Sequence, residues 1–304
     1  MRSTSATTPV TLTNCGEQVT VAAPPARVVS LNQAATEVLL ALGLQDRMIG
    51  TAYLDDAVAP QYRAAYASVP VLSDEYPSKE ALLAAEPDFV YASYGSAFGD
   101  EGVGPRSALE RLGIGSYVPP LACEDTSLRP PRVTFDGVLA EIAEIGRIFG
   151  VSQAADALIA EQRARLDRVT AGGSVGAGVT VLWWDSETKA PFVGACCGGP
   201  AMIMDAVGAT NVFADVKGSW ENVDWEQVVA ADPDVIVLVD ASWDTAADKL
   251  AFVQTRPALR RLPAFAQGRT VTIPFSDTSP GVRIVEGVEA LANGLRELGA
   301  TTGS

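Results

Sequence analysis

The chain contains no histidine among its 304 residues. This absence excludes imidazole ligands for zinc, acid–base catalysis by histidine, and the serine–histidine–aspartate and cysteine–histidine nucleophile systems. A large share of enzyme chemistry is therefore removed before any motif is considered.

Basic residues are scarce, since 22 Lys and Arg stand against 37 Asp and Glu and give a formal net charge of -15. A protein that binds nucleic acid normally presents a basic face, so that class is disfavoured. No run of about 18 apolar residues exists that could span a membrane. Residues 1–9 are rich in serine and threonine and lack the apolar stretch of a signal peptide. The sequence therefore predicts either a cytosolic protein or one whose signal segment is missing.

Cysteines are few, and none of the four forms a CxxC pair. A thiolate zinc site or a thioredoxin-like centre is therefore disfavoured. If Cys15 and Cys123 belong to one lobe, a disulfide between them would pin the N-terminal segment. Closing a loop of roughly 100 residues would stabilise the fold by about 4–5 kcal/mol in the chain-entropy model. Cys196 and Cys197 could form a vicinal disulfide or remain two buried thiols, and the sequence leaves this open.

Strand and helix patterns alternate along the chain. Hydrophobic residues make up 48% of it, which is enough for a sizeable core. Short apolar runs typical of buried strands lie at 27–31, 88–92, 116–118, 179–184, 235–239 and 270–273. Helical patterns separate them, and this order predicts an α/β fold with mainly parallel sheets. We expect an N-terminal segment at 1–25, a first lobe at 26–150, a connecting helix at 151–172 and a second lobe at 173–304.

A repeated motif supports two lobes of similar structure. Residues 80–88 and 226–234 both read Glu-x-aliphatic-aliphatic-Ala-Ala-acid-Pro-Asp, and a strand pattern follows each. In both, proline ends a helix and forces an extended entry into the strand. The alternative is that this helix–proline–strand junction is common to α/β proteins in general. Two equivalent lobes commonly hold a ligand in a cleft between them.

The order of several motifs resembles that of a known family. They are 25–31 followed by Thr36-Glu37 and Leu42-Gly43, then 86–90, 112–114, 211–215, Trp220 with 225–228, and 232–235. With these motifs the chain resembles the ABC-transporter substrate-binding proteins that serve iron-siderophores, haem and cobalamin, over about residues 10–298.

The resemblance implies two Rossmann-like α/β lobes bridged by a single long helix, at about 154–169 here. It implies a monomer that is not an enzyme and needs no cofactor. Such a protein captures a small ligand between its lobes and delivers it to the permease of an ABC importer. The family is exported and often lipid-anchored, so the resemblance places the protein in the periplasm or at the cell surface.

Aromatic residues are the first candidates for ligand contacts. By position, Tyr94 and Trp220 match aromatics that line the cleft in this family. Flat rings bury a large area at low entropic cost. Lesser candidates, at strand or loop ends, are Tyr53, Phe98 and Trp184. Ordinary packing is the alternative for each, and one of the adjacent Trp183 and Trp184 is expected in the core because neighbours on a strand face opposite ways.

Polar candidates lie in loops that follow strands. Asp277 and Arg283 bracket the loop before the last helix, where they could contact a ligand or be merely solvated. Asn32 could present its amide to the ligand, although an N-cap for the following helix is slightly favoured.

Exposed carboxylates are candidates for docking to a permease. In the family one such group on each lobe docks into arginine pockets of the permease. Glu226 matches the position on the second lobe, and Glu101 lies near the matching position on the first, with Glu80 as the rival.

The scarcity of basic residues bears on the type of ligand. Only Arg283 can be placed near the expected cleft, so a neutral or cationic ligand is favoured, such as a ferric hydroxamate complex or a corrinoid. Two alternatives stay open. One is an enzyme that uses Asp185, Asp277 or Glu37 as acid or base. The other is a ligand sensor on the same scaffold.

Overall fold

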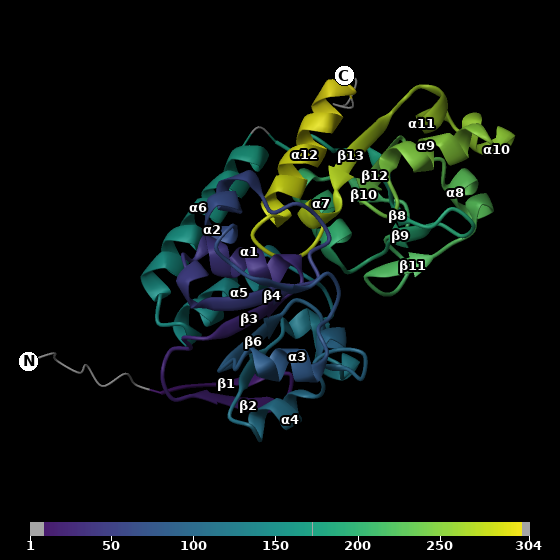
Figure 1. Ribbon diagram of the computed structural model, residues 1–304. Helices are drawn as coiled ribbons and strands as arrows, with labels where there is room; N and C mark the ends of the chain where they lie inside the picture. Colours follow the sequence, from purple (N-terminus) through teal and green to yellow (C-terminus); the bar gives the residue numbers. More distant parts are fainter. Residues whose placement is uncertain (1–8, 172, 300–304) are drawn as a thin grey trace, which may run out of the picture. The chain divides into compact units, whose positions relative to one another are not determined.

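The computed structural model describes residues 9–171 and 173–299, and it confirms the predicted α/β class. The chain divides into two compact units (Figure 1). Unit 1 comprises Met1–Pro130 and Asp136–Ala160, and unit 2 comprises Pro131–Phe135 and Glu161–Ser304. No helix of the described residues is long and apolar enough to cross a membrane.

Unit 1 is built on a five-stranded sheet in which all neighbouring strands are parallel, in the order β5-β4-β3-β6-β7. The central strand β3 reads Val-Val-Ser-Leu and is buried at all four positions, as expected for a strand covered on both faces. The strands are β3 Val28–Leu31, β4 Met48–Ala52, β5 Val71–Ser73, β6 Phe89–Ala92 and β7 Gly115–Tyr117. The α-helices are α1 Gln33–Ala41, α2 Arg63–Tyr66, α3 Lys79–Ala84, α4 Arg106–Glu110 and α5 Phe135–Ile148, whose first residue belongs to unit 2.

An antiparallel hairpin, β1 Val10–Asn14 and β2 Glu17–Val21, precedes this sheet. A disulfide joins Cys15 in its turn to Cys123 in the loop after β7, so the structure contains the predicted bridge. The amide of the buried Asn14 adds to it, since it donates to the carbonyl of Val118 at 2.9 Å and accepts from its N–H at 3.2 Å. The hairpin is therefore fixed to the end of β7.

Unit 2 has a mixed sheet in the order β11-β9-β8-β12-β13, with β10 also paired to β8. β8, β10, β12 and β13 run parallel, whereas β9 and β11 are antiparallel to their neighbours. The strands are β8 Thr180–Ser186, β9 Phe192–Gly194, β10 Thr210–Asn211, β11 Trp220–Asn222, β12 Val235–Asp240 and β13 Thr270–Pro274. The α-helices are α7 Gly199–Val207, α8 Trp225–Ala231, α9 Ala246–Gln254, α10 Pro257–Arg260, α11 Pro263–Ala266 and α12 Ile284–Glu297.

The helix α6, Ser152–Thr170, runs through the segment predicted to connect the lobes, and the division between the units falls within it. That residues 151–172 act as the bridge remains a prediction.

The repeated motif has the same role in both units. Its acidic residue before proline adopts a left-handed backbone, with φ of 52° at Glu86 and 43° at Asp232. Its last aspartate then fixes the start of the neighbouring strand. Asp88 accepts from the N–H groups of Ala26 and Arg27 at 2.8 and 3.0 Å, and Asp234 accepts from the N–H and hydroxyl of Thr180 at 2.8 and 2.7 Å. In each unit the motif therefore ends a helix, and its aspartate binds the chain at the start of the neighbouring strand.

Candidate functional site

The carboxyl ends of the parallel strands are where α/β folds place ligand contacts. In unit 1, Asn32 follows β3, Tyr53 follows β4 and Tyr94 follows β6. In unit 2, Asp185 lies near the end of β8, and the segment after β13 carries Asp277.

Asn32 positions a tyrosine in unit 1. Its side chain is 2% exposed and makes no capping hydrogen bond to α1, so the favoured N-cap role is wrong for the side chain. The amide instead lies 3.1–3.2 Å from the phenolic oxygen of Tyr76, which also lies 3.0 Å from the hydroxyl of Ser96. The loop after β5 supplies this partner from a distant part of the sequence. Tyr76 is therefore a residue of this edge that the sequence analysis missed.

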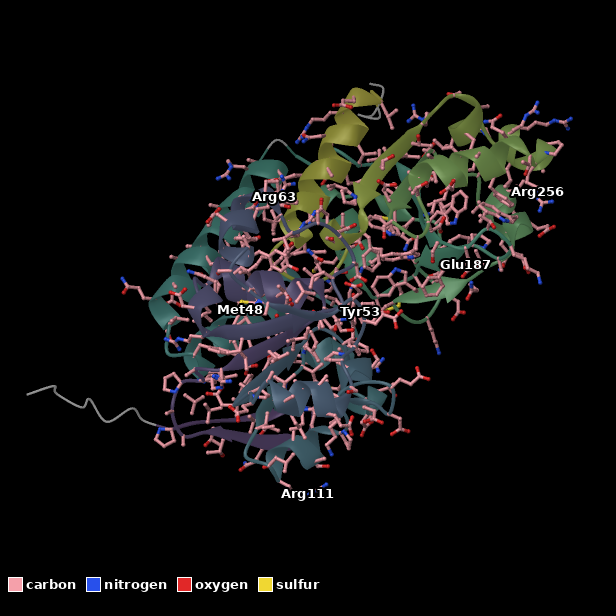
Figure 2. All side chains as sticks on the ribbon, in the orientation of Figure 1. Met48, Tyr53, Arg63, Arg111, Glu187 and Arg256 are labelled. Atoms are coloured by element: carbon pink, nitrogen blue, oxygen red, sulfur yellow. A yellow bond between two sulfur atoms is a disulfide. The ribbon has the colours of Figure 1, made fainter. Side chains whose placement is uncertain are left out.

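Tyr53 packs edge-on against Tyr76, with ring centroids 4.6 Å apart. Its φ of 58° is left-handed, which is uncommon for a bulky side chain and costs on the order of 1–3 kcal/mol. Such strain often accompanies function. Near it, burial and then the Asp56 carboxylate raise the pKa of Asp55 to about 6. Tyr53 is one of the side chains labelled in Figure 2.

The other two aromatic candidates of unit 1 differ in their surroundings. Tyr94 is half-buried at the start of a 3-10 turn, Gly95–Phe98. Phe98 is only 6% exposed and belongs to the hydrophobic core, where the guanidinium of Arg106 lies 5.9 Å from its ring centroid. Phe98 thus packs mainly in the core of unit 1, and its role as a ligand contact stays a prediction.

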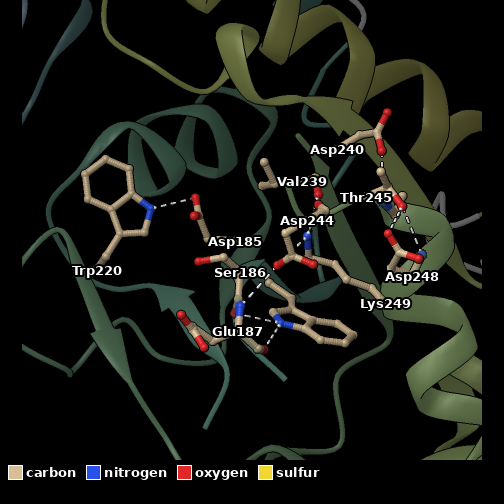
Figure 3. Close-up of polar contacts among 12 residues, drawn as sticks. Asp185, Ser186, Glu187, Trp220, Val239, Asp240, Asp244, Thr245, Asp248 and Lys249 are labelled. Carbon is tan, nitrogen blue, oxygen red and sulfur yellow. Dashed lines mark hydrogen bonds and ion pairs between the residues drawn. The ribbon is translucent and has the colours of Figure 1, made fainter. Parts of the chain in front are cut away.

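In unit 2 the half-buried Trp220 is tethered to Asp185. Its indole N–H donates to the Asp185 carboxylate at 3.1 Å (Figure 3). Burial raises the pKa of Asp185 to about 6, although the Trp220 hydrogen bond and the Lys249 charge oppose the rise. The pair fixes an aromatic face near the end of β8.

Trp184 lies on the same strand but is fully buried, and so is Trp183. The prediction of a core tryptophan at this pair is therefore confirmed, and it holds for both residues. β8 is a central strand, so helices and loops cover both of its faces. Trp184 packs edge-on against Trp225 at 4.8 Å, and its N–H lies 2.9 Å from the carbonyls of Ser186 and Glu187. It packs the helix α8 against the sheet and is not exposed to a ligand.

Asp277 and Arg283 form a largely buried ion pair rather than two solvated groups. The guanidinium lies 2.6 Å from the Asp277 carboxylate and 3.5 Å from that of Glu286. The guanidinium of Arg165 lies 3.6 Å from the same Glu286 carboxylate and 2.7 Å from that of Glu289, so two cations here face three carboxylates. This arrangement suits a neutral or cationic ligand better than a multiply charged anion.

The candidate docking carboxylates are all exposed. Glu226 and Glu80 occupy the first turns of α8 and α3, which are the equivalent helices of the repeated motif. Glu101 lies in a turn before α4.

The three carboxyl groups considered as an acid or base of an enzyme all make contacts within the fold. Glu37 is 1% exposed and accepts hydrogen bonds from Gln33 and from the N–H of Ala59 at 2.6 and 3.0 Å. Asp185 and Asp277 are engaged as described above. Within 9–171 and 173–299, no group of three cysteine, aspartate or glutamate residues is arranged to hold a metal ion.

A vicinal disulfide joins Cys196 and Cys197, which settles the question left open by the sequence. The loop that carries it lies beside the chain before Trp220, because the N–H of Ala195 donates to the carbonyl of Ser219 at 3.0 Å. The bridge thus belongs to the surroundings of the Trp220 site.

One tryptophan at this edge was not anticipated. Trp243 lies in the loop after β12 and is 57% exposed. Its position just beyond a buried strand, which Tyr94 shares, is the sequence signal that could have identified it.

Comparison with known proteins agrees with this architecture. Residues 28–276 match a family described as periplasmic binding protein. The chain belongs to that family. A cobalamin-binding protein of Halobacterium salinarum is 28% identical over 287 residues, which are 90% of this chain and 70% of that protein.

Two solved structures are also similar to this periplasmic binding protein. A periplasmic binding protein of Veillonella parvula is 27% identical, with a TM-score of 0.83 over 94% of this chain and 97% of that one. An ABC-type Fe³⁺-hydroxamate transport system protein of Saccharomonospora viridis is 28% identical, with a TM-score of 0.78 over 95% and 99% of the two chains. The family is one of binding proteins, in agreement with the expectation of a non-enzymatic role.

Proposed function

We propose that the protein captures a small neutral or cationic ligand outside the cytoplasm and delivers it to an ABC importer. The observation that carries the proposal is the Trp220–Asp185 pair, which holds an aromatic face at a strand end where α/β proteins bind ligands. Membership of the periplasmic binding protein family supports it.

The proposed ligand is a ferric hydroxamate complex or a corrinoid. Relatives named for cobalamin and for Fe³⁺-hydroxamate transport support this choice. So does the pairing of Arg283 with Asp277 and Glu286, because a catecholate complex with several negative charges needs more positive charge than this edge provides. Tyr53, Tyr94 and Trp220 are the proposed ring contacts, with Asp277 and Arg283 as polar neighbours.

The proposed location is extracytoplasmic, at the periplasm or the cell surface. All four cysteines are paired in two disulfides, which form and persist in oxidising compartments. Lipid anchoring and a monomeric state are part of the proposal. The partner is the permease of the importer, reached through Glu226 on unit 2 and through Glu101 or Glu80 on unit 1.

The test is a tryptophan-fluorescence titration of the folded protein with ferric hydroxamates, ferric catecholates, haem and cobalamin. Saturable quenching by one hydroxamate or corrinoid, with weaker binding in Trp220→Ala, is the expected result. Leu250→Ala is the control, because it removes an exposed apolar side chain on α9 of the same unit. Equal titration curves for the wild type and Trp220→Ala would remove Trp220 from the site. Absence of any response would reject the proposed ligand.

A further inference from the structure

Trp243 is the most exposed large hydrophobic residue of the described chain, at 57%. Much of its apolar ring surface is therefore left in water, where a ligand could cover it. Its ring packs edge-on against Phe275, with centroids 5.0 Å apart. Phe275 directly follows β13, the neighbour of β12, so both rings come from the carboxyl edge of the sheet.

The loop that carries Trp243 is held by a fully buried lysine. The ammonium of Lys249 donates to the carbonyls of Val239 and Asp244 at 2.8 and 2.7 Å and lies 3.1 Å from the Asp244 carboxylate. Figure 3 shows this ammonium at the end of β12. Burying a lysine is costly, and here its hydrogen bonds fix both ends of the short loop.

Further bonds hold the same loop. Ala241 and Asp244 pair as an isolated bridge, and the Asp244 carboxylate also accepts from the N–H of Glu187 at 3.1 Å. The Asp240 carboxylate accepts from the N–H of Ala246 at 2.8 Å. The exposed indole therefore projects from a backbone that is tied before and after it, and a ligand that stacks on it pays little ordering entropy.

The charges around the platform favour one chemical class. Asp185, Asp240 and Asp244 gather near the ends of β8 and β12, and the Lys249 cation is already paired with Asp244. An acidic edge repels anions, and the face of an indole attracts cations.

We propose that the exposed indole of Trp243, held edge-on by Phe275 as an aromatic platform, contacts an uncharged or cationic face of the ligand, as a second contact on unit 2 in addition to Trp220. This inference rests on the proposed function and deepens it, because it assigns a further binding residue and narrows the class of ligand.

The test is isothermal titration calorimetry of the full chain with a ferric hydroxamate, cobalamin, haem and a ferric catecholate. Trp243→Ala is expected to weaken binding of the hydroxamate or corrinoid about tenfold, and Trp243→Phe, which keeps a ring, about threefold or less. Leu250→Ala is the matched control and leaves the affinity within about twofold. Circular dichroism of each variant verifies the fold.

The outcomes separate the two proposals. If the wild type binds and Trp243→Ala binds equally well, the platform is overturned while the proposed function stands. Preferential binding of the anionic catecholate overturns the assigned class of ligand. If the folded wild type binds none of the four compounds, the proposed function fails, and the platform fails with it.

Discussion

The indole nitrogen of Trp220 and the carboxylate of Asp185 lie 3.1 Å apart, and this one bond links a proposed ring contact to a buried acid. Because burial raises the pKa of Asp185 to about 6, the folded protein favours the protonated carboxyl. The unfolded chain ionises first as pH rises, so stability is lost between pH of about 4 and 6 and stays lost above that.

Asp185→Asn is therefore expected to raise the free energy of unfolding by about 2 kcal/mol at pH 8 and to change it little near pH 4. The asparagine oxygen can still accept from Trp220. Urea unfolding at pH 4, 6 and 8 measures the difference, with the exposed Asp215→Asn as control. A difference that does not change with pH would contradict the assignment.

Lys249→Met is expected to lower the free energy of unfolding by about 3–5 kcal/mol, because it leaves the Asp244 carboxylate and two carbonyls without their cation. Adding Asp244→Asn should recover part of the loss, since the unpaired charge is then removed. Chemical denaturation of the two single variants and the double variant measures the coupling. Additive losses would show that the pair does not act as described.

The two disulfides are expected to differ in their effect on stability. Cys15 and Cys123 are 108 residues apart, so replacing both with serine should cost about 2–5 kcal/mol. Cys196 and Cys197 are neighbours, and their bridge constrains almost none of the unfolded chain. The corresponding double variant should cost less than about 1 kcal/mol. Thermal unfolding of both variants tests the contrast, and equal losses would refute it.

Glu226→Arg should leave ligand affinity within about twofold and reduce uptake through the cognate importer at least about tenfold, because a reversed charge opposes docking. Glu297→Arg, at an exposed position near the end of α12, is the control. Uptake into proteoliposomes that contain the importer is the readout. The same reversal at Glu101 and at Glu80 then decides which carboxylate serves unit 1. Unchanged uptake in Glu226→Arg would remove the proposed docking role.

Most of the predicted strands and helix ends followed from local patterns of apolar residues and proline. Buried strands such as Phe89–Ala92 and Val235–Asp240 stand out because both of their faces are apolar, and proline marks the helix ends before them. The short antiparallel strand β11 carries too little periodicity to be recognised from its residues alone.

The candidate site was harder to predict, because side-chain roles depend on partners that are distant in sequence. Asn32 looks like a helix cap in its local context, yet Tyr76 provides its partner. Trp184 and Trp220 are both tryptophans at strand positions, and Trp184 is a core residue because Trp225, Phe252 and Phe265 pack against it. The exposure of Trp243 depends on a loop held by Lys249, which the sequence does not reveal.

The hydrogen bonds of Asp88 and Asp234 each stay within one unit, so neither unit needs the other to align the first strand of its sheet. Each unit carries its own copy of the nine-residue motif, and each copy aligns a strand of its own sheet. The two units can then unfold in separate thermal transitions, and differential scanning calorimetry would show whether one unfolds at a lower temperature than the other.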